Sequence, residues 1–380
     1  MLYPHATPIC RRADRGKRST RGRSVSLKRT EIPVEGYEQV LHFEDPDSGL
    51  KAYISVHDTT LGPALGGMRM WPYPTEAEAL EDANRLAKAM TYKAAIAQTG
   101  QGGGKAVILG DPSTKTEALL RAIGRAIESL NGQYITAEDM NLTVADLEVV
   151  RQETRWVSGL SREAGSSGDP SPFTALGCLA GLRACAQETF GSDDLAGLRV
   201  AIQGVGAVGG RLAGLCAEAG ATIFVSDLDA SHARAIADEH RATFVEDPDA
   251  LLTMECDILS PCARGAVLDA KRIPDLNCRI VAGAANNQLA DDQCAEQLAA
   301  RDILYAPDYV INAGGILNIA CEFADGGYTE DEARRRVEEI GETLHSIFGR
   351  AREQGITTEA AARGLAEERL NEGRKTGGHD

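Results

Sequence analysis

A glycine-rich turn between two β-branched runs constrains the second half of this chain most strongly. Residues 199–203, Arg-Val-Ala-Ile-Gln, form a strand-like run with β-branched Val200 and Ile202, and they lead into Gly-Val-Gly-Ala-Val-Gly at residues 204–209. An amphipathic segment follows as far as Gly220, and a second β-branched run, 222–225, ends just before Asp227. This order of strand, glycine turn, helix, strand and acidic residue is typical of a dinucleotide-binding βαβ unit.

The residues of this motif have separate expected roles. Gly204 permits the turn, Gly206 lets a pyrophosphate approach the helix N-terminus, and Gly209 lets helix and strand pack closely. Asp227 would hydrogen-bond the ribose hydroxyls, and it favours NAD over NADP because a carboxylate repels a 2′-phosphate. A purely structural glycine turn is the alternative, which the complete strand–helix–strand setting disfavours.

Three further strand-like runs follow at residues 256–259, 279–282 and 303–306, with helical spacers between them. This alternation predicts a doubly wound parallel sheet, in which ligands bind at the carboxyl ends of the strands. Asparagines in the loops after these runs can bind nicotinamide, ribose or a carboxylate, or can serve as turn residues alone. The residues that we expect to bind the cofactor are Gly204, Val205, Gly206, Ala207, Val208, Gly209, Asp227, Cys262, Ala263, Ala284, Asn286 and Asn312.

Two lysines in the first half, Lys93 and Lys105, occupy unusual positions. From Thr75, which opens a capping-box pattern, apolar residues recur in helical steps as far as Ala97, and Lys93 fills one of these steps. A cation on an apolar face needs an anionic partner or a lowered pKa, unless its head reaches water. The two lysines together favour a functional site over two solvated side chains.

Three glycines at residues 102–104 precede Lys105, and a short strand is predicted over residues 106–109. Such a run lets a ligand approach the backbone, although a flexible turn with an exposed lysine is the alternative. Asp139 can accept a proton beside Lys105, or it can be the N-cap of a helix that begins near Val144. The local sequence favours neither role for Asp139.

The bulk composition argues against several classes of protein. The chain has 380 residues, enough for two domains with sizeable cores. Its net charge of −16 disfavours nucleic acid as a partner, and no apolar run approaches the ~20 residues of a membrane span. Nine scattered cysteines, without CxxC or Cys/His clusters, predict free thiols in a cytoplasmic protein and no metal site.

The first thirty residues are strongly basic and differ from the rest of the chain. A transit peptide would be amphipathic, but residues 9–25 have almost no apolar face. We therefore interpret residues 1–30 as a disordered tail or as the product of an upstream start codon.

Five further motifs resemble those of a known family. They are GPALGG at residues 62–67, MTYK at 90–93, GGGK at 102–105, TAED at 136–139 and NAGG at 312–315. In this order, and together with the glycine turn, they resemble the amino acid dehydrogenases that act on glutamate, leucine, phenylalanine and valine. The resemblance extends from about residue 35 to about residue 370.

The resemblance implies reversible, NAD-dependent oxidative deamination of an L-amino acid to the 2-oxo acid and ammonia by a homo-oligomer. It implies that Lys105 holds the attacking water, that Asp139 handles the amino-group proton and that Lys93 binds the substrate carboxylate. Desolvation and the charge of Lys93 should both lower the pKa of Lys105. The residues that we expect to contact the substrate are Lys93, Gly66, Leu65, Met90, Ala137, Asn287, Ile316 and Ile319.

The resemblance also bears on the substrate side chain. Leu65 stands where glutamate dehydrogenases carry a lysine, so a glutamate carboxylate would be unpaired there. Ala137 beside bulky Ile316 indicates a narrow apolar pocket for leucine, valine or isoleucine. Met140-Asn141 and Asn286 instead resemble phenylalanine dehydrogenases, which makes phenylalanine the second choice.

These observations predict a two-domain α/β architecture. We expect a substrate and oligomerisation domain at residues 31–165, a Rossmann-type NAD domain at 166–330, and helices at 331–380 that pack back across the hinge before a disordered end. Closure of the cleft between the domains would exclude water. A non-catalytic NAD-binding regulatory protein is the alternative, but it should have lost Lys105 or Asp139. A malate-type dehydrogenase would not need both lysines.

Overall fold

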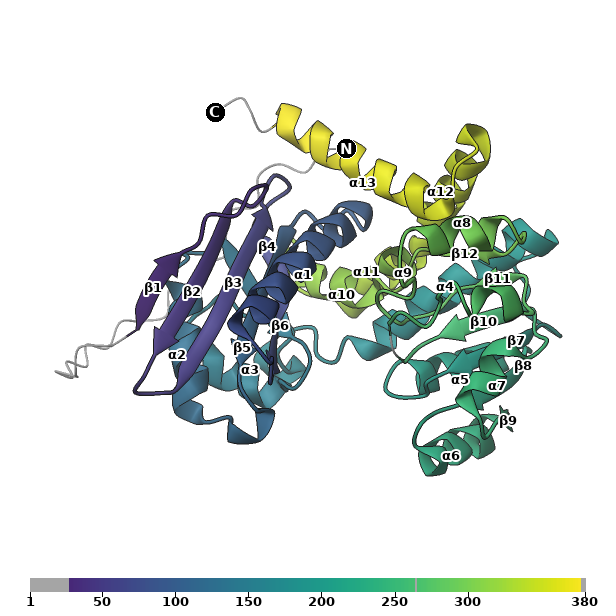
Figure 1. The fold of residues 1–380 in the computed structure, drawn as a ribbon, viewed down its shortest axis with the longest axis horizontal. Helices are drawn as coiled ribbons and strands as arrows, with labels where there is room; N and C mark the ends of the chain where they lie inside the picture. The colour runs from purple at the N-terminus through teal and green to yellow at the C-terminus, as the bar shows by residue number, and fades with distance from the viewer. Residues whose placement is uncertain (1–26, 264, 377–380) are drawn as a thin grey trace. The chain divides into compact units, whose positions relative to one another are not determined.

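The computed structural model describes residues 27–263 and 265–376, which form two compact units (Figure 1). Unit 1 takes its described residues from Met1–Thr91, Gly100–Gly168 and Ile319–Thr329. Unit 2 takes its described residues from Tyr92–Thr99, Asp169–Asn318 and Glu330–Asp380. The first long helix, α1 (Glu76–Ile96), therefore begins in unit 1 and ends in unit 2.

Unit 1 is built on a six-stranded mixed sheet in the order β1-β2-β3-β5-β4-β6. The strands are β1 Lys28–Glu31, β2 Gln39–Asp45, β3 Leu50–Asp58, β4 Ala64–Trp71, β5 Gly102–Leu109 and β6 Tyr134–Glu138. Strand β4 runs parallel to both of its neighbours, β5 and β6, whereas the other pairs are antiparallel. This arrangement places the carboxyl ends of β4, β5 and β6 at one edge of the sheet.

Alternation along the strands divides the side chains of unit 1 between two cores. Ile54 on β3 and Ala106 on β5 belong to the large core that α2 (Glu117–Glu128) and α3 (Val144–Arg151) cover. Val107 instead packs with the alanines of α1 in a smaller core. Because side chains of a strand alternate between faces, Lys105 lies on the α1 side of the sheet with Val107.

The basic tail ends earlier than the sequence indicated. Lys28 and Arg29, which we counted with a tail over residues 1–30, belong to β1 and pair with β2. Backbone pairing and a 3.4 Å ion pair between Lys28 and Glu44 on β2 order this polar edge strand. The rest of the expected tail, residues 1–26, lies outside the described residues.

Unit 2 contains a six-stranded sheet in the order β12-β11-β10-β7-β8-β9, in which every pair is parallel. The strands are β7 Arg199–Gln203, β8 Thr222–Ser226, β9 Thr243–Phe244, β10 Ile258–Pro261, β11 Ile280–Val281 and β12 Leu304–Tyr305. This is the strand order of a dinucleotide-binding doubly wound fold, so the expected fold class is confirmed. The order reverses beside β7, whose carboxyl end carries the glycine turn.

The helices of unit 2 surround this sheet and extend to the carboxyl end. They are α4 Ser171–Phe190, α5 Gly209–Glu218, α6 Ala230–His240, α7 Pro248–Thr253, α8 Gln293–Ala299, α9 Asp308–Ile311, α11 Glu330–Glu338, α12 Ile340–Gln354 and α13 Thr358–Thr376, while α10 Gly314–Ala320 ends in unit 1. Short 3-10 turns lie at Pro112–Thr114, Arg162–Ala164, Ile273–Asp275 and Cys321–Phe323. Helices α11 and α12 pack against α4, and α13 packs against α12 and β12. Across the described ranges, every helix is too short or too polar to cross a bilayer.

Candidate functional site

Strand pairing in unit 1 brings Lys105 and Asp139 together. Lys105 lies on β5 and Asp139 follows β6, with β4 between these two strands. The Lys105 Nζ atom lies 2.5 Å from Asp139 Oδ2, and the lysine side chain is only 7% exposed. Gly67 on β4 leaves room for this pair, since an added Cβ atom would lie 2.7 Å from the Cβ of Asp139.

A second cation, Arg69 on β4, contacts the same carboxylate. Its Nε atom donates to Asp139 Oδ2 at 3.0 Å. Burial by itself raises the pKa of Asp139. The positive charges of Lys105 and Arg69 lower it by a larger amount, so the net pKa lies well below its usual range. Burial lowers the pKa of Lys105, and the charge of Arg69 adds to this effect against the opposing charge of Asp139. Asp139 is therefore ionised at neutral pH, while Lys105 gives up its proton more readily than a solvated lysine.

The arginine was missed in the sequence. We expected the charge of Lys93 to lower the pKa of Lys105, and the charge of Arg69, which the sequence did not point to, has this effect in the structure. The pattern Met68-Arg69-Met70 contained a signal, because both methionines belong to the large core and Arg69 must face the opposite side, toward α1. Sequence alone does not give the register in which Arg69 pairs with Val107, two residues after Lys105.

The three glycines before Lys105 form the start of a strand. They belong to β5 and are buried, so they do not form a flexible turn. An added Cβ atom at Gly103 would lie 2.1 Å from the Thr91 hydroxyl oxygen, and one at Gly104 would lie 2.8 Å from the ring of Tyr134. The glycine run therefore lets the protein's own helix α1 and an aromatic ring approach the strand closely, while the approach of a ligand stays a prediction.

Helix α1 begins as predicted, but only the first part of its predicted buried face, Ala79 and Ala83, is fully buried. The Oγ1 atom of Thr75 accepts a hydrogen bond from the backbone N–H of Glu78 at 3.2 Å, as in a capping box. Its fully buried face runs through Ala83, Ala87 and Thr91, whereas Lys93 is half-buried at the edge of that face. The shift has a physical cause, because small residues let the helix approach Gly103 closely.

Asp139 is not the cap of the following helix. Thr143 caps α3, since its side chain accepts from the backbone N–H of Asp146 while the Asp146 carboxylate accepts from the backbone of Thr143. The alternative reading of Asp139 is thereby removed. The Asp139 carboxylate instead contacts Lys105 and Arg69.

The expected substrate residues are divided between the two units. Leu65 and Ala137 are buried on adjacent strands of unit 1, and an added Cβ atom at Gly66 would lie 3.4 Å from Met90 Cγ. Ile319 also belongs to unit 1 and is half-buried. The members that belong to unit 2 are Lys93, Asn287 and Ile316.

The glycine turn of unit 2 has the geometry that its sequence predicts. Gly204 adopts φ +90°, and an added Cβ atom at Gly209 would lie 1.9 Å from the Gly204 carbonyl oxygen. At Gly206, by contrast, no neighbouring atom of the described residues lies within 4 Å of an added Cβ atom. The carboxylate of Asp227 accepts a hydrogen bond from the backbone N–H of Val205 at 2.9 Å. The turn is therefore tightly packed at both ends and open in the middle.

The loops after β10, β11 and β12 carry a second polar cluster. Asn312 donates through Nδ2 to Asn286 Oδ1 at 2.7 Å and to the Ala284 carbonyl at 3.1 Å. The Sγ atom of Cys262 lies 3.5 Å from the backbone N–H of Ala284. The buried Oδ1 atom of Asn312 has no hydrogen-bond partner among the described residues. An unpaired acceptor of this kind suits a ligand that brings N–H donors, such as a carboxamide.

The described residues contain neither a metal-binding cluster nor a disulfide bond. No group of three or more histidine, cysteine, aspartate or glutamate side chains in these ranges is placed to hold a metal ion. The cysteines of the described chain are free thiols, and burial raises the pKa of several of them, Cys185 and Cys216 included.

The combination of a doubly wound sheet with an open glycine turn and a separate α/β unit with a buried lysine–aspartate pair defines a two-domain dinucleotide-dependent enzyme. Family models support this class. The model for the Glu/Leu/Phe/Val dehydrogenase dimerisation domain matches residues 37–156, and the glutamate/leucine/phenylalanine/valine dehydrogenase model matches residues 225–378.

Individual relatives agree with the family models. The chain is 49% identical over 341 residues to leucine dehydrogenase of Thermoactinomyces intermedius, covering 90% of this chain and 92% of that protein. It is 45% identical over 342 residues to valine dehydrogenase of Streptomyces virginiae, covering 89% and 95%. The crystal structure of L-tryptophan dehydrogenase from Nostoc punctiforme is similar, with a TM-score of 0.78, 45% identity, and coverage of 90% and 97%.

The chain therefore belongs to the Glu/Leu/Phe/Val dehydrogenase family and is an amino acid dehydrogenase. Enzymes of this family are NAD(P)-dependent oxidoreductases, in agreement with the parallel sheet of unit 2. The relatives act on different amino acids, so the family alone does not fix the substrate of this chain.

Proposed function

We propose that this enzyme catalyses the reversible, NAD-dependent oxidative deamination of branched-chain L-amino acids, leucine above all, to the 2-oxo acid and ammonia. The observation that carries the proposal is the buried ion pair between Lys105 and Asp139, at 2.5 Å. A buried, perturbed lysine beside an ionised carboxylate is the equipment that proton transfer near neutral pH requires.

In this proposal each side chain of the pair moves a different proton. Asp139, which is ionised, takes the proton of the substrate amino group. Lys105, with its lowered pKa, removes a proton from the attacking water and then polarises the carbonyl oxygen that forms. Lys93 binds the substrate carboxylate.

The residues of unit 2 fit a nicotinamide dinucleotide. When bound, this group supplies the acceptor for the hydride from the substrate Cα atom. The open position beside Gly206 would admit its pyrophosphate, and the unpaired Asn312 Oδ1 would accept from its carboxamide. We propose NAD over NADP because the Asp227 carboxylate follows β8 and would repel a 2′-phosphate.

The choice of a branched aliphatic substrate rests on the apolar residues that we expect to contact the substrate side chain. Leu65 and Ala137 are buried, and leucine at position 65 offers no charge to pair with a glutamate side chain. An aromatic amino acid is the second candidate, because Met140-Asn141 and Asn286 resemble phenylalanine dehydrogenases. The 45% identity to a tryptophan dehydrogenase supports the same alternative.

We also propose a homo-oligomer and a division of labour along the chain. The match to a family dimerisation domain over residues 37–156 supports assembly through the first half. Residues 31–165 would bind the amino acid, residues 166–330 would bind NAD, and the helices of residues 331–380 would pack across the hinge.

Initial rates of NADH and NADPH formation with L-leucine, valine, isoleucine, phenylalanine, tryptophan and glutamate test the proposal. We expect the highest kcat/KM with leucine and NAD, and only background rates with glutamate. Lys105→Ala should lose about 10³-fold in kcat, whereas the matched control Lys88→Ala, an exposed lysine on α1, should not. Full activity in Lys105→Ala, or a preference for glutamate, would contradict the proposal.

A further inference from the structure

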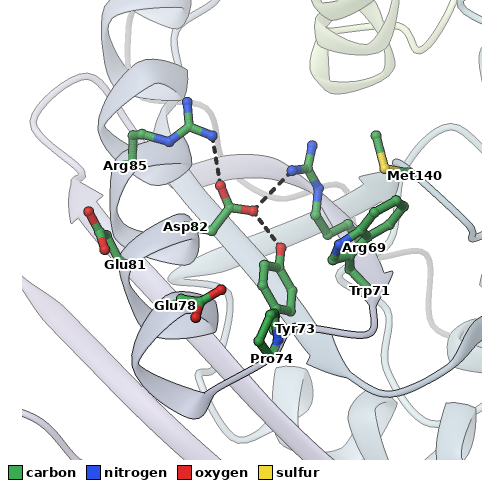
Figure 2. Close-up of a pocket in the computed structure, with 9 residues that line it drawn as sticks. All are labelled: Arg69, Trp71, Tyr73, Pro74, Glu78, Glu81, Asp82, Arg85 and Met140. Atoms are coloured by element: carbon green, nitrogen blue, oxygen red, sulfur yellow. Dashed lines mark hydrogen bonds and ion pairs between the residues drawn. The ribbon is translucent and has the colours of Figure 1, made fainter.

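A network of hydrogen bonds connects the Lys105–Asp139 pair, through Arg69, to the wall of a pocket in unit 1. Figure 2 shows the part at the pocket wall, where Arg69, Tyr73 and Arg85 contact Asp82. Arg69 donates through Nε to Asp139 and through Nη1 to Asp82 Oδ2, each at 3.0 Å. Tyr73 donates its hydroxyl proton to the same Asp82 oxygen at 2.5 Å. Arg69 and Lys105 therefore contact the same atom, Oδ2 of Asp139.

The network holds the arginine in a fixed orientation. The guanidinium group of Arg69 binds the carboxylates of Asp82 and Asp139 through different nitrogen atoms. A planar group that binds two carboxylates has little freedom to rotate. The side chains of Arg69 and Asp82 are only 17% and 16% exposed, so solvent and salt screen these contacts weakly. Asp82 lies on α1 and Arg69 lies on β4, so their ion pair joins two packed elements of one unit.

We propose that Arg69 is a positioning residue of the reaction: held by Asp82 and Tyr73, it fixes the Asp139 carboxylate against Lys105 and places a second positive charge beside that lysine. It acts through Asp139 and Lys105 and needs no contact with the substrate. The proposal rests on the proposed function for its kinetic readout, and it concerns residues to which that function assigned no role.

The charged groups that act on Lys105 give the direction of the expected pH effect. They are Asp139 after β6, Arg69 on β4 and Asp82 on α1, while burial raises the pKa of Tyr134 on β6 and keeps it neutral. Burial lowers the pKa of Lys105 most, and Arg69 lowers it further, whereas the two carboxylates raise it. Loss of the Arg69 charge should therefore raise the pKa of Lys105, and loss of the Asp82 charge should lower it.

Arg69→Gln and Arg85→Gln form a matched pair for the test. Both variants remove an arginine that pairs with Asp82, but Arg85 binds from the exposed side and does not reach Asp139. Arg69→Gln should lower kcat about 100-fold and move the acid limb of the kcat/KM profile to higher pH. Arg85→Gln should keep kcat within about twofold and leave the limb in place.

Two further variants separate positioning from a general structural role. Arg69→Lys keeps the charge but loses the planar fork, so it should keep the position of the acid limb and lose only part of kcat. Asp82→Asn should move the limb to lower pH, opposite to Arg69→Gln, even if Arg69→Gln does not fold. Coincident profiles for Arg69→Gln and Arg85→Gln, or for Asp82→Asn and the unmodified enzyme, would overturn the proposal.

A readout without turnover distinguishes this proposal from the proposed function. Reductive ¹³C-methylation of the lysines, with Lys105→Ala to assign the signal, reports the titration of Lys105 by NMR. Arg69→Gln should raise its midpoint, and Arg85→Gln should not. An enzyme that oxidises none of the six amino acids but shows this shift would refute the proposed function alone. Normal turnover with an unmoved midpoint would refute the positioning role alone.

Discussion

The two glycine-rich segments of this chain, residues 102–104 in unit 1 and residues 204–209 in unit 2, use their glycines differently. In the first, an added Cβ atom at every position would meet the protein's own atoms, such as the Thr91 hydroxyl beside Gly103. In the second, the outer glycines are equally crowded, but the space beside Gly206 is open in the described structure. A glycine motif therefore indicates a ligand site only where a side chain would enter space that the fold leaves empty.

The comparison predicts its largest effect at Gly103. Gly103→Ala should destabilise the fold by about 3 kcal/mol or more, because the methyl group would overlap backbone and side-chain atoms of Thr91 and the carbonyl of Ala87. Urea unfolding measures the change. The control is Gly349→Ala in α12, where no neighbouring described atom lies within 4 Å of the added carbon and stability should rise by up to about 1 kcal/mol. Unchanged stability of Gly103→Ala would break the comparison.

Two partly buried carboxylates extend the comparison of the units to charge. Asp139 in unit 1 is held between two cations, whereas burial raises the pKa of Glu359 in unit 2 to about 7, with the nearby Asp308 adding to the effect and Arg363 opposing it. A carboxyl group whose pKa is raised on folding contributes stability that is complete below its unfolded pKa of about 4.3 and is lost as the pH rises toward 7. The folded protein is therefore penalised by Glu359 above neutral pH.

Glu359→Gln removes this penalty. The difference in unfolding free energy between the variant and the unmodified protein should grow in favour of the variant from pH 5 to pH 8, by on the order of 2–3 kcal/mol. Urea unfolding at both pH values measures the difference. Equal pH dependence of the two proteins would show that folding does not raise the pKa of Glu359.

The smallest effect on folding is expected at the open glycine. Gly206→Ala should leave the free energy of unfolding within about 0.5 kcal/mol, since the added methyl group meets no described atom. NAD affinity should fall by about tenfold, which corresponds to about 1.4 kcal/mol. Titration calorimetry with NAD measures the affinity, and Gly349→Ala again serves as control. An unchanged Kd would mean that the open space beside Gly206 is not used.

The sequence predicted the parts of the fold that depend on local patterns. The strands around the glycine turn, the capping residue Thr75 and the parallel sheet of unit 2 all follow from short-range periodicity and turn chemistry. The proximity of Lys105 and Asp139 was also anticipated, although the sequence left open whether Asp139 was a helix cap.

What the sequence could not supply depends on register between distant strands. Arg69 joins the site because β4 lies between β5 and β6, an order that does not follow the chain. The buried face of α1 matches the expected one at Ala79 and Ala83 and then continues through Ala87 and Thr91, which hydrophobic periodicity alone did not select. Its close packing is decided by Gly103, which lies on a strand after the helix.

The crowding at the two ends of the glycine turn has a consequence for ligand affinity. Gly204 packs against Ala263 and Gly209 packs against Gly204, so the folded chain leaves the two ends of the turn little room to move before a ligand arrives. When a loop becomes ordered only on binding, the entropy that it loses weakens the affinity for the ligand. Here the turn is preorganised, because the loss is incurred during folding, and the full strength of the contacts at the helix N-terminus remains available to the bound nucleotide.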